Sequence, residues 1–358
     1  MCRREAIYEL AWITLSPTLL QKPENSLNGL EPFIEEYFDK MNDFTSTSSM
    51  EETLNLLVTC FTTSKFGLIN ISEEKFQGWF ENFSSLNDYL ISKSENINDK
   101  CSLLETKGFL LYQKHIIRLE EISEQDIEKP FEEILVLLDQ APLFPVSQLG
   151  KRIDSIIEML ISAEVDDDFV TYLEEYSERL LPYVEKRESN YSTGKYHIEK
   201  GTSYLYSKRK NNIVKALDSF HKAKDLWLNE ETFEGFILAL INISQLYSAL
   251  GMNMAAKYYS LCGVWSAFNN ENTRLVKRVS DSYSMVFHAD FGQGAWISAL
   301  ENLESCIIAR DQFDAAPIDI DQDEALRKSL IEASVILSLG PEISPQISGY
   351  LEYQKTSM

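Results

Sequence analysis

Apolar side chains recur every three or four residues along most of this chain, which is the period of one face of an α-helix. The pattern is clearest over residues 198–268, where it predicts two consecutive pairs of helices. In the helix expected over residues 233–250, this face comprises Phe233, Phe236, Ile237, Leu240, Ile241, Ser244 and Tyr247. Gly251 comes next, and a glycine suits the left-handed conformation that often ends a helix because it has no Cβ to clash.

The two predicted helix pairs carry small and aromatic residues at related positions. These are Gly201, Tyr204, Ala216, Phe220 and Ala223 in the first pair, and Ser244, Tyr247, Gly251, Ala256 and Gly263 in the second. Ala256 follows Ala216 by 40 residues, within the roughly 20–50 residues that are usual for helical repeats. The pattern resembles the tetratricopeptide repeat, although the family's terminal proline is absent from both pairs. The resemblance implies an all-α fold, an α-α superhelix of antiparallel helix pairs; a generic helical bundle is the alternative.

The resemblance also implies where a partner would bind. In this family, a stripe beside the packed face of each first helix lines a concave surface that holds extended peptides. On the helix over residues 233–250 this stripe comprises Leu238, Ile241, Asn242, Gln245 and Ser248. Its two amides can donate and accept hydrogen bonds. The candidate partner-binding residues are therefore Lys195, Thr202, Tyr206, Asn242 and Gln245, unless they are ordinary surface residues.

Residues that interrupt helices suggest three regions. Pro142 and Pro145 mark the best boundary. Residues 1–145 form an N-terminal helical region, residues 146–310 the tetratricopeptide-like repeats, and residues 311–358 an acidic loop with a C-terminal capping helix. Outside the two central pairs, helices are expected over residues 4–15, 30–42, 101–121, 272–288, 295–308 and 323–339.

Several local signals predict where individual helices begin or end. Ser49 with Glu52 reads as a capping box, and Ser72 as the start of an aromatic-rich helix. Pro130 is expected near a helix start and Pro182 at a helix end or kink. The segment 289–294 is expected to be a turn.

Composition and charge narrow the class of protein. Hydrophobic residues make up 44% of the 358 residues, so a sizeable core can form. The net charge of −23 argues against a nucleic-acid surface, which needs clustered Lys and Arg, and against binding to an anionic membrane. Five widely spaced cysteines fit reduced thiols, and no apolar run approaches the ~18 residues of a membrane span. We expect a cytoplasmic protein; a helical pattern that begins almost at Met1 leaves open a segment of a larger one.

No sequence motif points to catalysis or to a metal. Glycine-rich phosphate loops and nucleophile elbows are missing, and the four histidines lack zinc-ligand spacing. Asp319, Asp321 and Asp323 alternate as at the start of a calcium loop, but the central Gly and the late Glu are missing. We therefore expect no catalytic residue, no cofactor and no metal. An enzyme whose site is assembled from distant residues is the weaker alternative.

These observations favour a protein–protein interaction scaffold or sensor module whose helical-repeat groove binds a peptide or protein partner. The competing interpretation is a structural subunit of a larger assembly. A groove lined by polar residues would favour the first, and a broad exposed apolar patch the second. The sequence identifies neither the partner nor a small-molecule ligand.

Overall fold

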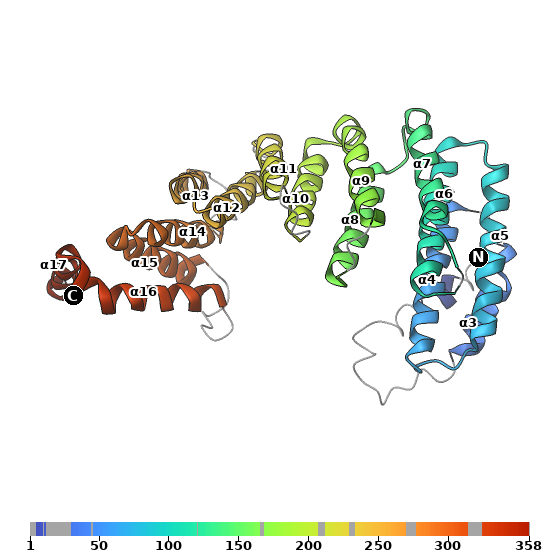
Figure 1. Ribbon diagram of the computed structural model, residues 1–358, viewed down its shortest axis with the longest axis horizontal. Coiled ribbons are helices and arrows are strands. Elements are labelled where there is room, and N and C mark those ends of the chain that lie inside the picture. The colour runs from blue at the N-terminus through green and yellow to red at the C-terminus, as the bar shows by residue number, and fades with distance from the viewer. Residues whose placement is uncertain are drawn as a thin grey trace. The chain divides into compact units, whose positions relative to one another are not determined.

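The computed structural model describes residues 5–9, 11, 30–43, 46–119, 121–164, 168–206, 212–228, 233–269, 277–313 and 324–357. Within these ranges all regular secondary structure is helical, which confirms the predicted fold class (Figure 1). The chain divides into two compact units, Met1–Leu149 and Gly150–Met358. The alternating aspartates at 319, 321 and 323 lie outside the described residues.

The first unit has an aromatic core. Its described helices are α3 (Glu31–Asp39), η1 (Met41–Asp43), α4 (Thr47–Lys65), α5 (Glu73–Lys93), α6 (Ile97–Ile116), α7 (Glu124–Leu137) and η2 (Leu138–Gln140). The ring of Trp79 lies 4.9 Å from that of Phe38 and 5.3 Å from that of Phe76, between centroids. Trp79 Nε1 donates to Asp39 Oδ1 at 3.0 Å, so its polar atom is satisfied beside the core.

Serines begin several helices of this unit. Ser72 accepts a hydrogen bond from the backbone N–H of Lys75 and caps α5, as predicted. The prediction of a cap at Ser49 is wrong: Ser46 caps α4, and Ser49 supplies the N–H that it accepts. The reason is that Ser46 has the extended backbone of a capping residue, whereas Ser49 already lies buried in the first turn.

Pro130 lies inside α7 rather than near its start, which corrects the prediction. The helix begins after Ser123, whose hydroxyl accepts from the Asp126 N–H and donates to the Asp126 carboxylate. This reciprocal cap satisfies N-terminal donors and so starts the helix before the proline. Pro130 itself is buried, and its packing offsets the backbone hydrogen bond that it cannot make.

The helices from α8 onward follow one another along the chain. They are α8 (Val146–Ser162), α9 (Asp168–Arg187), α10 (Asn190–Tyr206), α11 (Asn212–Leu226), α12 (Phe233–Ala249), α13 (Asn253–Phe268), α14 (Lys277–Gln293), α15 (Trp296–Phe313), α16 (Glu324–Ile343) and α17 (Pro345–Ser357). None of the helices that the structure describes is long and apolar enough to cross a membrane.

Neighbouring helices of the second unit pack as antiparallel pairs. Between α12 and α13, Ser244 Oγ donates to the Ala256 carbonyl at 2.9 Å, and the ring of Tyr247 stacks on that of Tyr259. Helix α10 likewise contacts α11, α14 contacts α15, and each of these pairs contacts the next. This arrangement confirms the predicted α-α superhelix.

The predicted small residues lie where helices approach closely. Ala216, Ala223 and Ala256 are fully buried. A Cβ on Gly201 would lie 2.5 Å from Phe220 Cε1 of the paired helix. Gly263 instead faces the following helix, where a Cβ would lie 2.8 Å from Ser282 Oγ of α14.

Helix ends in the second unit are predicted less well than helix pairs. Gly251 has a φ of 73°, as expected, and ends the turn after α12. The predicted turn at residues 289–294 is wrong, because α14 continues to Gln293 and only Gly294 takes a positive φ. The reason is Asp290, which is fully buried and accepts hydrogen bonds from Lys257 and Ser298. Pro182 lies within α9, which continues to Arg187.

The C-terminal end also differs from the prediction. The helix expected over residues 323–339 extends through Pro341 to Ile343, and α17 follows without having been predicted. Gly340 packs against Ile347 of α17, where a Cβ would lie 2.6 Å from Ile347 Cδ1. The two helices thus pack closely through an apolar contact. The glycines and prolines of this segment predict the end of a helix and give no sign of such a contact.

Candidate functional site

A cavity of about 450 Å³ lies between α8 and α10 in the second unit. Its lining residues share the helical spacing of one face on each helix: Lys151, Asp154, Ser155 and Glu158 on α8, and Ile198, Glu199 and Thr202 on α10. Six of these seven side chains are polar. The cavity therefore offers hydrogen-bonding groups beside apolar surface, and it suits a ligand that carries both polar and apolar groups.

A buried ion pair adjoins the cavity, because one of its members, Asp154, is a lining residue. The side chains of Lys200 and Asp154 are only 2% and 8% exposed, and Lys200 Nζ lies 2.7 Å from Asp154 Oδ1. Ser177 of α9 accepts from Lys200 Nζ at 2.6 Å and donates to Asp154 Oδ1 at 2.8 Å. A buried charge is tolerated only when it is paired and hydrogen-bonded. The three residues therefore tie α8, α9 and α10 together beside the cavity.

Two tyrosines of α10 surround this ion pair. Lys200 Nζ lies 5.1 Å from the ring centroid of Tyr204, close enough for a cation–π interaction. The Tyr204 hydroxyl lies 3.4 Å from Glu178 Oε1, and burial raises the pKa of Tyr204. Burial also raises the pKa of Tyr196, which packs against Gly150 of α8. Both phenols therefore remain neutral, and they pack closely around the ion pair.

The rim carries more acidic than basic groups. Glu199 forms ion pairs with Lys151 at 2.9 Å and with Lys195 at 3.9 Å. Glu158 forms no ion pair with a residue that the structure describes. Its pKa is raised by burial and by the nearby charge of Asp154, against an opposing hydrogen bond from Ser203. A cation placed beside Glu158 would relieve this unfavourable charge.

One of the predicted partner-binding residues lines this cavity, and a second contacts a residue of its rim. Thr202 lines it, although its hydroxyl donates to the Ile198 carbonyl of the same helix at 2.9 Å. Lys195 is exposed and reaches the rim through Glu199. Tyr206 is the last residue of α10, and its side chain lies outside the described residues.

The other two predicted residues lie on α12 and do not line the cavity. Asn242 is half-buried and Gln245 is exposed. Their neighbour Ile241 was expected on the same open stripe, but it is 5% exposed and packs in a cluster with Ala267 and Val279. The apolar contact with α13 and α14 thus closes part of the predicted stripe on α12.

Asp154, Lys200 and Glu158 are site residues that the sequence analysis missed. Asp154 and Lys200 stand 46 positions apart, so no local spacing connects them. One signal was available: Asp154 lies between Ile153 and Ile157 on the apolar side of its helix, where a charged residue needs a partner.

A second polar cluster joins α14 to α16. His288 Nδ1 lies 2.9 Å from Glu332 Oε2, and His288 Nε2 lies 3.3 Å from Ser329 Oγ. This order of groups is that of a serine-hydrolase triad. Ser329, however, is 1% exposed, so a substrate could not reach its hydroxyl. Burial lowers the pKa of His288 although Glu332 opposes the shift, and the cluster acts here as a link between helices.

The comparisons with known proteins are negative: no protein-family model matches this chain, and no curated protein is similar enough to be a relative. Within the described residues, no group of three or more His, Cys, Asp or Glu side chains is placed to hold a metal ion.

Proposed function

We propose that this chain is a protein-interaction module that binds a peptide segment of a partner along α8, α10 and α12, in the manner of tetratricopeptide repeats. The observation that carries the proposal is the cavity between α8 and α10, whose lining includes polar side chains from two successive first helices. Thr202 lines this cavity, and Lys195 forms an ion pair with the lining residue Glu199. In the proposed complex the peptide continues past the cavity to Asn242 and Gln245 of α12.

The charges at the cavity indicate the kind of peptide. Glu158 forms no ion pair with a residue that the structure describes, and the chain carries a net charge of −23, which attracts basic partners over long range. A Lys or Arg side chain would pair with Glu158. The peptide backbone could then use the hydroxyls and amides along the face. The proposed partner is therefore an extended segment with at least one basic residue.

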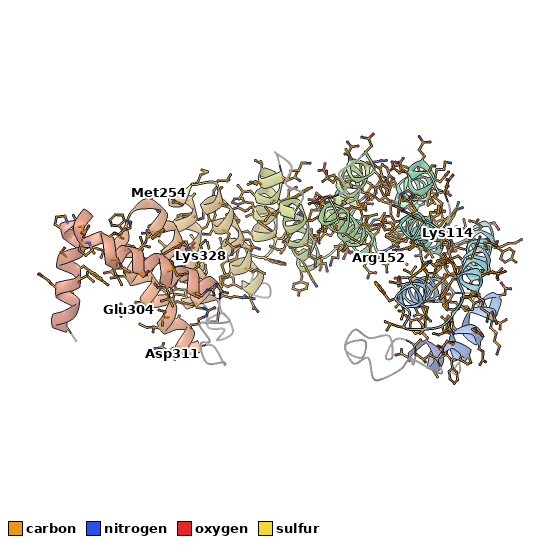
Figure 2. The ribbon with its side chains drawn as sticks, turned by 60° about the horizontal axis from the view of Figure 1, so that its bottom comes forward. Lys114, Arg152, Met254, Glu304, Asp311 and Lys328 are labelled. Carbon is orange, nitrogen blue, oxygen red and sulfur yellow. The ribbon has the colours of Figure 1, made fainter. Side chains whose placement is uncertain are left out.

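Selection from a displayed random-peptide library, with the full chain as bait, tests this proposal. The enriched peptides should share a Lys or Arg. Glu158→Lys should weaken their binding by about tenfold or more, because it places two cations together. Glu304→Lys is the matched control, since Glu304 is an exposed residue of α15 (Figure 2). Absence of enriched peptides, or equal losses in the two variants, would reject the α8–α10 cavity as the binding site.

A second variant tests whether the binding face extends beyond the cavity to the end of α10 and to α12. The triple change Tyr206→Ala, Asn242→Ala and Gln245→Ala should weaken the selected peptides with little change in melting temperature. If the triple variant binds the selected peptides as tightly as the unaltered chain does, the binding face comprises α8 and α10 without α12.

One observation favours the second candidate function, a structural subunit of a larger assembly. Helix α13 exposes a row of large apolar side chains, of which Trp265 is 67% exposed. Isolated proteins rarely leave such a surface uncovered. Mass measurement in solution, described below, tests whether assembly occurs.

A further inference from the structure

The outer face of α13 is unusual for a surface helix. Its exposed residues are all large and apolar: Met254 (71% exposed), Tyr258 (64%), Leu261 (42%), Trp265 (67%) and Phe268 (56%). They are separated by intervals of four, three, four and three residues, so they form one line along the helix. We call this line the α13 stripe; Met254, at its first turn, is labelled in Figure 2.

The inner face of α13 explains why these residues are not used within the chain. The helix packs on α12 and α14 through small residues, among them Ala256, Ser260 and Gly263, which are buried. Close approach of the helices is thus achieved with small side chains, and the large ones point outward. The core of this unit is complete without the α13 stripe, so its apolar surface remains for another molecule.

The α13 stripe is also electrically neutral. The one charged residue of α13 is Lys257, and its ammonium is engaged by Asp290 Oδ1 at 2.6 Å, off the stripe. In a chain of net charge −23, a neutral surface is the place where two copies approach with least repulsion. A partner that recognised this protein by charge would bind elsewhere.

We propose that a second copy of this chain covers the α13 stripe, with α13 packed on α13 about a two-fold axis. Intervals of three and four residues are those of a helix–helix seam. A two-fold interface must be complementary to itself. With the helices antiparallel and the axis near residue 263, Tyr258 lies opposite Phe268 of the second copy and Leu261 opposite its Trp265. Four of the five stripe residues then meet a large side chain of the second copy across the seam, and Met254 lies beyond them at the end of the seam.

The area of the stripe is sufficient for such a dimer. A fully buried aromatic side chain removes about 150–250 Å² from water, so the five partly exposed residues offer roughly 500–700 Å² per copy. Two copies would bury roughly 1,000–1,400 Å², which reaches the lower range of specific interfaces. Leu250 and Met252, at 44% and 52% exposed, extend the patch at its start.

The mass of the full chain in solution tests this proposal, by light scattering or sedimentation over a dilution series. The expected mass is that of two chains at high concentration, and it should fall on dilution. Trp265→Glu and Tyr258→Glu should each raise the dissociation constant at least tenfold, because a carboxylate would be buried in an apolar seam. Circular dichroism should show unchanged helix content in both variants, since the altered residues are exposed.

Val214→Glu is the matched control, because Val214 of α11 has the same exposed fraction as Trp265 (67%) and lies on another helix. It should dimerise like the unaltered chain. The mass of a single chain at every concentration would overturn the proposal. So would a dimer that survives both α13 substitutions, or one that Val214→Glu weakens equally. The proposal does not depend on the peptide-binding function, which the library selection tests separately.

Discussion

Buried ionisable side chains are the residues whose behaviour departs most from their ordinary chemistry. In the second unit, Lys200 and Asp154 form a buried ion pair, with Nζ 2.7 Å from Oδ1. In the first unit, Glu105 of α6 is 6% exposed, and burial raises its pKa to about 8. The two cases differ because the lysine has a carboxylate in contact, whereas desolvation dominates at the glutamate.

Glu105 makes the stability of the first unit depend on pH. Its carboxyl is neutral in the folded chain below about pH 8 but ionises near its ordinary pKa of 4.5 when unfolded. A raised folded pKa contributes stability that is present below pH 4.5 and is lost as pH rises through 8. Glu105→Gln should therefore raise the free energy of unfolding at pH 8 by roughly 2–4 kcal/mol and change it little at pH 4.5.

Urea unfolding at the two pH values measures this effect. Glu304→Gln, at an exposed position, is the control and should leave both curves unchanged. An unaltered pH dependence in Glu105→Gln would show that this carboxyl ionises normally in the folded chain.

Removing one partner of the buried Lys200–Asp154 ion pair should lower the stability of the fold more than removing both partners. Asp154→Ala leaves the buried Lys200 ammonium without its carboxylate and should lower the free energy of unfolding by about 3–5 kcal/mol. Asp154→Leu combined with Lys200→Met should cost less, since no charge remains buried. For comparison, Glu73→Ala breaks an exposed ion pair with Lys65 and should cost at most about 1 kcal/mol. A double variant less stable than Asp154→Ala would contradict this account.

At the scale of helices, the side chains at the point where two helices cross mainly determine which helices pack as a pair. Between α10 and α11, Gly201 leaves room for Phe220. Between α12 and α13, Ser244 and Ala256 are small and joined by a hydrogen bond. Helix starts depend on a different signal, a capping side chain before the first turn. Ser72 and Ser123 both supply it, and Ser123 does so in spite of the following proline.

The crossing of α10 and α11 should not accept a larger residue. Gly201→Ala adds a Cβ 2.5 Å from the buried ring of Phe220, so the helices must separate. We expect a loss of about 1–3 kcal/mol in the free energy of unfolding. Gly78→Ala is the matched control, because a Cβ there meets nothing within 4 Å. That variant should gain about 0.5–1 kcal/mol from the better helix propensity of alanine. Equal effects of the two changes, measured by denaturant unfolding, would argue against close packing at Gly201.

At the scale of the whole molecule, two units use different means of stabilisation. The first buries an aromatic core that includes Phe38, Phe61 and Trp79. The second adds helix pairs one after another, so each pair depends mainly on its neighbours, as in repeat proteins. Its polar links, such as Lys257 with Asp290, join one pair to the next.

Metal removal should leave this architecture intact. Within the described residues no set of side chains could provide the roughly four ligands of a structural zinc site. Incubation with a strong chelator should therefore change neither the helical circular dichroism nor the melting temperature. A lowered melting temperature that zinc or calcium restores would reveal a metal site.

The order of polar and apolar residues was enough to predict the helical fold and the pairs of residues 198–268. The reason is that both depend on contacts between residues close in sequence, such as Tyr247 with Tyr259. Gly251 belongs to the same class, because its backbone conformation is a local property. Local helix geometry also placed Thr202 on the face that lines the cavity, and its role in binding a partner stays a prediction.

Contacts between distant residues decided the rest. Lys200 meets Asp154 only because α8 and α10 pack side by side, and nothing around either residue specifies the other. The continuation of α14 depends on hydrogen bonds to Asp290 from other helices. The same holds for α13, because only packing against α12 and α14 assigned its small residues to the inside and its large apolar ones to the surface. Periodicity shows which residues share a helix face, but which face is covered depends on the neighbouring helices.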